Sequence, residues 1–146
     1  MELTISTSVE QDYQSVMRGF NQNLFLKLNP PFPPVRLLRF DGCSKDDIVS
    51  LELNFLLFKQ QWTSVILEDG LDEKEFYFVD AGQKLPFFLK FWKHRHRIVK
   101  AGDGARIVDD ITFRSPFFLM DFLLWPVLWL QFLYRKPIYQ RVFKKA

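Results

Sequence analysis

Two histidines at alternate positions are the residues of this chain best suited to chemistry. They stand in the segment Trp92-Lys-His-Arg-His96, where a β-strand would point successive side chains to opposite faces. Trp92, His94 and His96 would then share one face, and Lys93 and Arg95 the other. Because cations prefer water, we expect the histidines to point into the protein.

A carboxylate is expected beside this inward pair. Asp109 shares a strand face with Ile111 and Phe113, and the turn at 102–104 makes its strand the antiparallel neighbour of the histidine strand. An Asp–His pair fixes the imidazole tautomer and raises its basicity. Two roles are open: a buried polar network that holds the sheet together, or a general base, His94 or His96, oriented by Asp109.

The histidines have three candidate environments: a core with satisfied ring nitrogens, a cluster that orients a ligand, and a metal site. Zn²⁺ needs a third and usually a fourth ligand, and only Asp109 or Asp80 is placed to converge. Cys43 is interpreted as a bystander thiol near a turn. The sequence therefore predicts no metal and no cofactor. It contains no activated Ser or Cys pattern, phosphate loop or dinucleotide fingerprint.

Composition indicates one domain over residues 1–146. The chain is 48% hydrophobic and contains 17 Phe, which is enough for one core without disulfides. A net charge of +3 is too small to indicate a nucleic-acid partner. A single cysteine fits a reducing compartment, and the N-terminus lacks the pattern of a secretory signal, so we expect a cytoplasmic protein.

The elements that position these residues can be predicted in order. A first strand at 2–7 is followed by a helix that starts at a Ser8 cap and ends near Gly19 or Phe20. A second short helix at 21–28 ends at the prolines of 30–34. Period-two segments then predict strands at 35–41, 47–58, 61–68, 74–80, 87–99 and 106–114, with turns at Asp41-Gly42, Asp69-Gly70, Ala81-Gly82 and Gly102-Asp-Gly104. Because no helix interrupts them, we expect an antiparallel meander of about seven strands and an α+β fold.

A long C-terminal helix is predicted to follow. Ser115 is its candidate cap and Pro116 its first residue, and the chain stays apolar over 117–134. Pro126 is expected to kink or split this helix.

The apolar stretch 117–134 requires an explanation. Its 18 residues are at the lower limit of a bilayer crossing, but Asp121, Gln131 and Pro126 argue against one. The two polar residues form only a narrow stripe, so one helix face can cover the sheet while other apolar surface remains. We expect that surface to meet a second subunit, as in a homodimer, or a membrane surface, with the basic tail 135–145 assisting at anionic lipid.

Short stretches along nearly the whole chain match one known pattern. They are Leu28-Asn-Pro-Pro31, Gln61-Trp62, Phe78-Val-Asp80, Pro86-Phe87, Trp92-Lys-His-Arg-His96, Asp109-Asp-Ile-Thr-Phe113, Pro116 and Arg135. With these residues the chain resembles the START/Bet v 1-like superfamily, also called SRPBCC or polyketide cyclase/dehydrase-like, and in particular its bacterial ligand-binding branch of unknown function. The resemblance implies a helix-grip fold, in which a curved sheet wraps the C-terminal helix and leaves a cavity. It implies no fixed reaction.

From this resemblance we expect a carrier or sensor that binds a hydrophobic small molecule or lipid between sheet and helix. Three polar groups, His94, His96 and Asp109, would orient the ligand. The candidate wall residues are aromatic: Trp62, Phe76, Phe78, Phe87, Trp92, Trp125 and Trp129. An ordinary filled core is the alternative for these aromatics. The alternatives for function are a cyclase or dehydrase-type enzyme and a non-catalytic oligomeric or membrane-surface protein.

Overall fold

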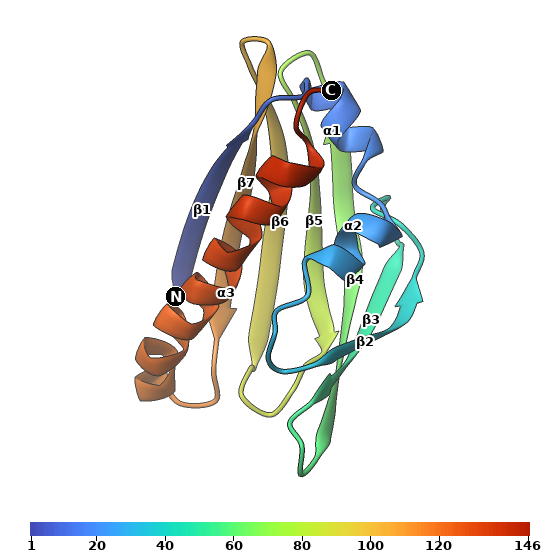
Figure 1. Cartoon of the computed structure of the whole chain (residues 1–146). Helices are drawn as coiled ribbons and strands as arrows, with labels where there is room; N and C mark the ends of the chain where they lie inside the picture. Colours follow the sequence, from blue (N-terminus) through green and yellow to red (C-terminus); the bar gives the residue numbers. More distant parts are fainter.

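One antiparallel sheet carries three helices on its concave side in the computed structural model, which describes residues 1–146 (Figure 1). Its strand order is β1-β7-β6-β5-β4-β3-β2, so all strands after β1 follow each other as hairpins. The elements are β1 Glu2–Val9, α1 Tyr13–Arg18, α2 Gln22–Lys27, β2 Val35–Phe40, β3 Ile48–Asn54, β4 Lys59–Leu71, β5 Glu75–Lys84, β6 Phe91–Ala101, β7 Gly104–Arg114 and α3 Phe118–Val142. The predicted α+β helix-grip fold with seven strands and two short helices after the first strand is confirmed.

Side-chain caps start both short helices. Asp12 accepts the backbone N–H of Ser15 at 2.9 Å, and Asn21 accepts that of Leu24 at 3.1 Å. The predicted cap at Ser8 is wrong, because β1 continues to Val9 and pairs Ser8 with Arg106 of β7. The first helix therefore starts later than its capping-box spacing indicated.

Two predicted turns are wrong because their glycines lie inside long strands. Gly70 belongs to β4 and pairs with Tyr77, and a Cβ at Gly70 would lie 2.5 Å from Cε1 of that ring. The glycine thus serves a close approach between strands. Gly82 likewise lies within β5. The β4–β5 turn falls at Asp72, whose carboxylate accepts two backbone N–H groups of the turn.

Helix α3 starts without the predicted cap. The Ser115 hydroxyl donates to the Phe117 carbonyl, and the carboxylate of Asp121 accepts the Ser115 backbone N–H at 2.6 Å. The helix then runs unbroken through Pro126 and on to Val142, so the expected split is absent. No helix of the structure combines the length and hydropathy of a membrane span.

The position of α3 on the sheet determines where space remains. The helix packs on β1 and β7, at one side of the sheet. One buried cluster, around Ile98, Ile107 and Tyr139, closes the end near α1, and a second, around Trp92, Phe113 and Phe132, fills the space beneath the middle of α3. Strands β2 to β5 are left without a covering helix of comparable length, and a cavity lies over them.

Candidate ligand-binding cavity

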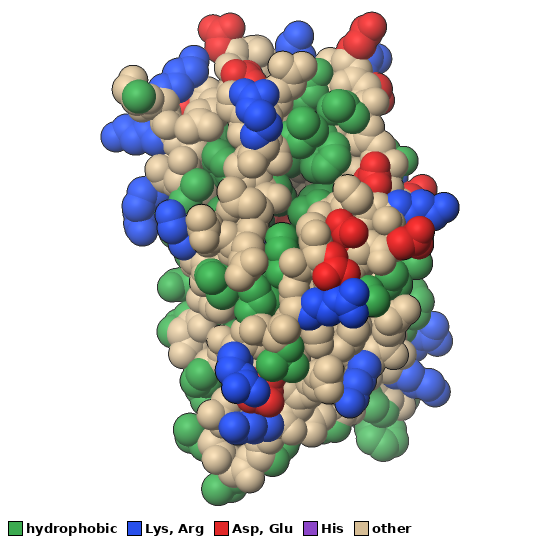
Figure 2. All heavy atoms as spheres, turned by 90° about the vertical axis from the view of Figure 1, so that its right-hand side faces the viewer, with side chains coloured by type: hydrophobic (Ala, Val, Ile, Leu, Met, Phe, Trp, Pro, Cys, Tyr) green, Lys and Arg blue, Asp and Glu red, His purple; other side chains and the backbone are tan.

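The cavity has a volume of about 510 Å³ and is lined mostly by hydrophobic side chains. Its walls come from α2, the loop after it, strands β2 to β6, and one face of α3. Figure 2, which views the molecule from the side of β2 and β3, shows hydrophobic side chains gathered around a hollow in the upper half of this face. A concave site of this size and character is typical of small-molecule binding.

Six predicted residues line the cavity: Trp62, Phe78, Phe87, Trp92, His94 and His96. Asp109 does not reach it, because it lies on β7 behind His94, and Phe76 packs into the cluster near α1. These placements follow from the order of the strands in the sheet, because β5 and β6 face the cavity and β7 lies further under α3.

Trp125 and Trp129 are wrongly predicted as wall residues. The Trp125 indole donates to the Glu2 carbonyl at 2.9 Å, and Trp129 stacks beside it on the side of β1. The cavity instead receives Leu124, Leu128 and Arg135. Adjacent helix positions are about 100° apart, so Trp125 points to a different side of α3 from its neighbour Leu124, which lines the cavity.

Four residues on three adjacent strands form a histidine–aspartate cluster at the cavity wall. His94 lies 2.8 Å from Asp109 through Nε2, and His96 lies 2.6 Å from Asp80 through Nε2. Both imidazoles therefore have their own carboxylate. Both hydrogen bonds are diagonal between neighbouring strands, because the residue directly opposite His94 is Asp80 and the residue directly opposite His96 is Asp109. The predicted contact between Asp109 and an inward histidine is confirmed.

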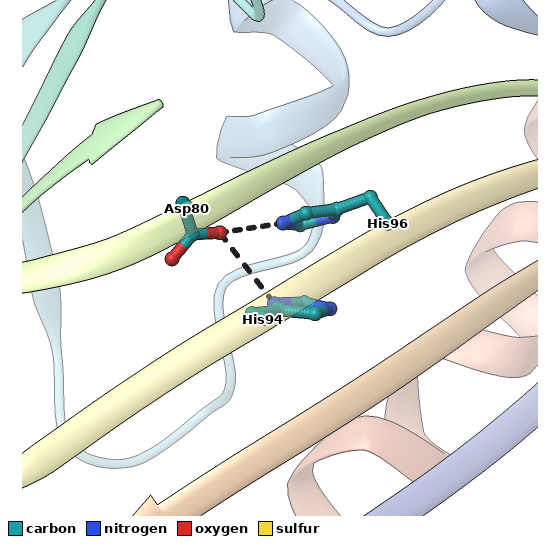
Figure 3. A group of neighbouring side chains, drawn as sticks. All are labelled: Asp80, His94 and His96. Atoms are coloured by element: carbon teal, nitrogen blue, oxygen red, sulfur yellow. Dashed lines mark hydrogen bonds and ion pairs between the residues drawn. The ribbon is translucent and has the colours of Figure 1, made fainter. Parts of the chain in front are cut away.

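The cluster is packed between aromatic rings. The two imidazoles stack on each other with centroids 3.5 Å apart, and His96 also stacks on Phe78 at 4.1 Å (Figure 3 shows the two imidazoles beside Asp80). The indole of Trp92 donates to the second oxygen of Asp80 at 3.1 Å and meets Trp62 edge-on. Asp80 is thus held by two donors, both of which come from β6.

Burial and hydrogen bonding set the charge of this cluster. Burial alone would raise the pKa values of Asp80 and Asp109, but the hydrogen bonds and positive charge of the histidines hold both pKa values below the ordinary value. Burial, together with the charge of the stacked His94, lowers the pKa of His96 to about 4. At neutral pH His96 is neutral, and its Nε2–H donates to Asp80.

Acidification should destabilise the protein through His96. Its pKa is lowered in the folded state, so the unfolded chain binds the proton more readily. The free energy of unfolding should be greatest above about pH 6.5 and fall as the pH drops toward 4. The loss is at most about 3 kcal/mol at 1.36 kcal/mol per pKa unit. Urea unfolding at several pH values measures it.

A matched variant separates this histidine from other titrating groups. His96→Gln retains an amide donor but cannot titrate, so its unfolding free energy should depend less on pH between 6.5 and 4. The protein has only two histidines, which makes NMR titration of both rings simple. A folded-state titration of His96 near 6.5 would contradict the proposed burial effect.

A metal ion would need this cluster to rearrange. Asp80, His94 and His96 offer three donor atoms within 4.8 Å of one another. Asp80 is the third ligand, and the sequence had indicated it only as a candidate. However, the two rings are stacked at an interplanar angle of 27°, so their lone pairs do not converge on one point. One ring would have to turn, and its carboxylate hydrogen bond would be lost.

Three further polar residues of the cavity region were not predicted to bind the ligand, and one of them, Asp80, was named only as a candidate metal ligand. Asp80 lines the cavity, and its position two residues after Phe78 on a strand was the available signal. Arg135 and Tyr139 line it from α3, one helical turn apart, and no strand period could show which way they point. The phenol oxygen of Tyr139 is buried and has no hydrogen-bond partner.

Cys43 also lines the cavity. Burial and the nearby carboxylates of Asp47 and Asp80 raise the pKa of its thiol to about 12. The thiol is therefore protonated at neutral pH and is a weak nucleophile.

The architecture and cavity together define a helix-grip protein with the START/Bet v 1-like fold. No family model matches the chain, and no curated protein matches it in sequence. Among solved structures, a protein from Chromobacterium violaceum has a TM-score of 0.72 at 12% identity, with 100% of this chain and 99% of that chain covered. The aromatase/cyclase Zhui from a Streptomyces species has a TM-score of 0.63 at 12% identity, covering 94% and 89%.

A plant enzyme extends the range of proteins with this fold. Norcoclaurine synthase from Thalictrum flavum has a TM-score of 0.63 at 10% identity, with 87% of this chain and 82% of that chain covered. At such identities the likeness concerns the fold, which hosts proteins with different activities.

Proposed function

We propose that this protein is a carrier or sensor that binds a hydrophobic small molecule or lipid in the cavity between the sheet and α3. The observation that carries the proposal is the cavity itself, about 510 Å³ with a mainly apolar lining and a few buried polar groups at one wall. A filled core would leave no space of this size, because protein interiors pack at crystal density.

The polar groups indicate what the ligand carries. Arg135 lines the cavity with its guanidinium 4.3 Å from the Phe132 ring centre and forms no ion pair, because the buried carboxylates pair with the histidines. Tyr139, one turn further, has a buried hydroxyl without a partner. An acidic group on the ligand would satisfy both, since guanidinium and phenol donate to carboxylate oxygens. The proposed ligand is a hydrophobic acid.

The cluster favours binding over proton transfer. The His94 Nε2 and His96 Nε2 atoms are engaged by carboxylates, and His96 Nδ1 is buried away from water. A general base needs a nitrogen within hydrogen-bond reach of the proton it removes. The fourth ring nitrogen, His94 Nδ1, lies 3.7 Å from the nearer oxygen of Asp80 and is outside these hydrogen bonds. Because the other three ring nitrogens are engaged or buried, we assign the cluster to shaping and anchoring the wall.

An enzyme of cyclase or dehydrase type is the second candidate. It is favoured by one observation, that each histidine has an orienting carboxylate, Asp109 for His94 and Asp80 for His96. In that case a single change, His94→Asn or His96→Asn, would abolish turnover of an enolisable carbonyl substrate while leaving its binding intact. Loss of binding in both variants, without turnover in the parent protein, would exclude this candidate.

Substituting Arg135 tests the acidic ligand. Arg135→Met should weaken binding of oleic acid at least tenfold and leave binding of oleyl alcohol nearly unchanged, because only the acid carries a charge for the guanidinium. Fluorescence displacement of a hydrophobic dye measures both affinities. Arg141→Met, on the exposed side of the same helix, is the control. Equal effects of Arg135→Met on acid and alcohol would contradict the assigned ion pair.

A further inference from the structure

Large apolar side chains are exposed together at one end of the molecule. They belong to three segments, 55–58 at the β3–β4 hairpin, 87–91 between β5 and β6, and 117–123 at the start of α3, which lie at the lower end of Figure 1. We call these segments the apolar end. They are joined by contacts, because Phe58 packs near Phe87 and the Lys90 backbone N–H donates to the Arg114 carbonyl.

The hairpin tip is the most exposed part of this end. Leu56 is 78% exposed and Leu57 is 95% exposed. Leu56 also has a positive φ of 73°, a conformation in which glycine or asparagine is favoured. A leucine at this turn therefore does not stabilise the fold. An exposed apolar tip of this kind is typical of a surface that contacts another molecule.

The first turns of α3 continue the apolar surface. Phe118, Leu119, Phe122 and Leu123 are each more than 60% exposed, while neighbours further along the helix pack on the sheet. The pattern is that of a helix whose N-terminal half has an unpartnered face.

Positive charge surrounds the apolar end. Lys59, Lys84, Lys90 and Arg114 flank the three segments and are exposed. The only acidic side chain within 54–60, 84–91 and 114–123 is Asp121, which is buried and accepts the Ser115 backbone N–H. Lys59 pairs with Glu52 at 3.8 Å, whereas Lys84, Lys90 and Arg114 form no ion pair. Apolar side chains framed by such cations are complementary to an anionic lipid bilayer.

We infer that the apolar end docks on the surface of an anionic membrane, with the leucines of the hairpin and the first turns of α3 entering the headgroup boundary and the lysines meeting lipid phosphates. A second copy of the chain fits less well. A two-fold interface would bring the same cations of both copies together, and like charges repel.

The basic tail does not belong to this surface, which corrects the expectation that it assists membrane contact there. Lys144 and Lys145 lie beside the end of β1 and α1, where Gln11 and Glu10 bond their backbone. They are at the far end of α3 from Phe118, and a 25-residue helix is about 37 Å long.

The cavity extends to the docking end. Phe55, Phe87 and Leu124 belong both to the cavity lining and to the region of the apolar end. A docked protein would hold this part of the cavity against the lipid, an arrangement suited to exchange of a lipid-soluble ligand. This consequence rests on the proposed function, whereas docking does not.

Vesicle flotation tests the inference. The unliganded protein should float with phosphatidylcholine vesicles that contain phosphatidylglycerol, bind pure phosphatidylcholine at least tenfold more weakly, and lose affinity as salt rises. The double variant Leu57→Glu/Leu119→Glu should bind the anionic vesicles at least tenfold more weakly. Both side chains are exposed, so the fold should be unaffected. Leu71→Glu, an exposed leucine at the other end of β4, is the control and should bind normally.

Other results would overturn it. Absence of flotation with anionic vesicles, or equal flotation of the double variant, excludes the membrane. A dimer in light scattering that the double variant dissociates would assign the apolar end to a second copy. A cavity-filling variant, Ser64→Phe, should still float, which separates failure of docking from failure of ligand binding.

Discussion

Ser64→Phe should strongly weaken uptake of hydrophobic ligands while the protein remains folded. Ser64 is buried on the cavity face of β4, between Trp62 and Ile66, and all three line the cavity. A phenyl ring at this position would occupy space that the proposed ligand needs. The existing void accepts the ring without the strain that overpacking causes in a filled core.

The expected loss of ligand affinity is at least tenfold, or about 1.4 kcal/mol. Dye binding and oleic acid displacement measure it, and circular dichroism checks the fold. Val65→Phe is the matched control, because it adds the same ring one residue along the strand on the opposite face. If Ser64→Phe binds ligand normally, the cavity is not the binding site. If it unfolds while Val65→Phe does not, the space is part of a packed core.

Asp109→Ala should lower the free energy of unfolding more than the other substitutions proposed. The carboxylate is 1% exposed and holds His94 at 2.8 Å, so Asp109→Ala leaves a buried ring N–H without an acceptor. Breaking a buried charged pair by removing one partner costs about 3–5 kcal/mol. Urea unfolding of the variant against the parent protein measures the change.

Two further variants make this result specific. Asp110→Ala removes the neighbouring carboxylate, which bonds Thr4 at the exposed face of β7, and should cost less than about 1 kcal/mol. Asp109→Asn keeps an acceptor for His94 and should fall between the two. Equal losses for Asp109→Ala and Asp110→Ala would show that the buried cluster contributes little to folding.

Strand periodicity predicted much of this cluster from the sequence. Alternation placed His94 and His96 inward and Lys93 and Arg95 outward, and the turn at 102–104 placed Asp109 opposite the histidines. These inferences succeed because a strand has a period of two, so one correctly placed residue fixes the faces of the others.

Helix rotation and glycine function were harder to predict. An apolar helix with few polar residues has no clear moment, so nothing in 117–134 distinguished the side of Trp125 from that of Leu124. Gly70 and Gly82 resemble turn glycines in sequence, but their role depends on the side chains of other residues, the ring of Tyr77 and the isobutyl group of Leu85. Local patterns do not contain such contacts.

Tertiary convergence accounts for the remaining difference. Arg135 and Tyr139 reach the cavity only because α3 lies across β1 and β7, and the three segments of the apolar end meet only in the folded sheet. Each segment alone is an ordinary hydrophobic stretch. The meeting of Arg135 and Tyr139 at the cavity supports the proposed ligand, and the meeting of the three segments supports the proposed membrane contact.

Native mass spectrometry of the protein purified from its own host tests whether the cavity holds a hydrophobic acid. We expect a stoichiometric apolar acid that mild extraction releases, with the emptied protein then taking up a hydrophobic dye. A folded protein that carries no compound and fails to take up the dye would contradict a ligand-binding cavity.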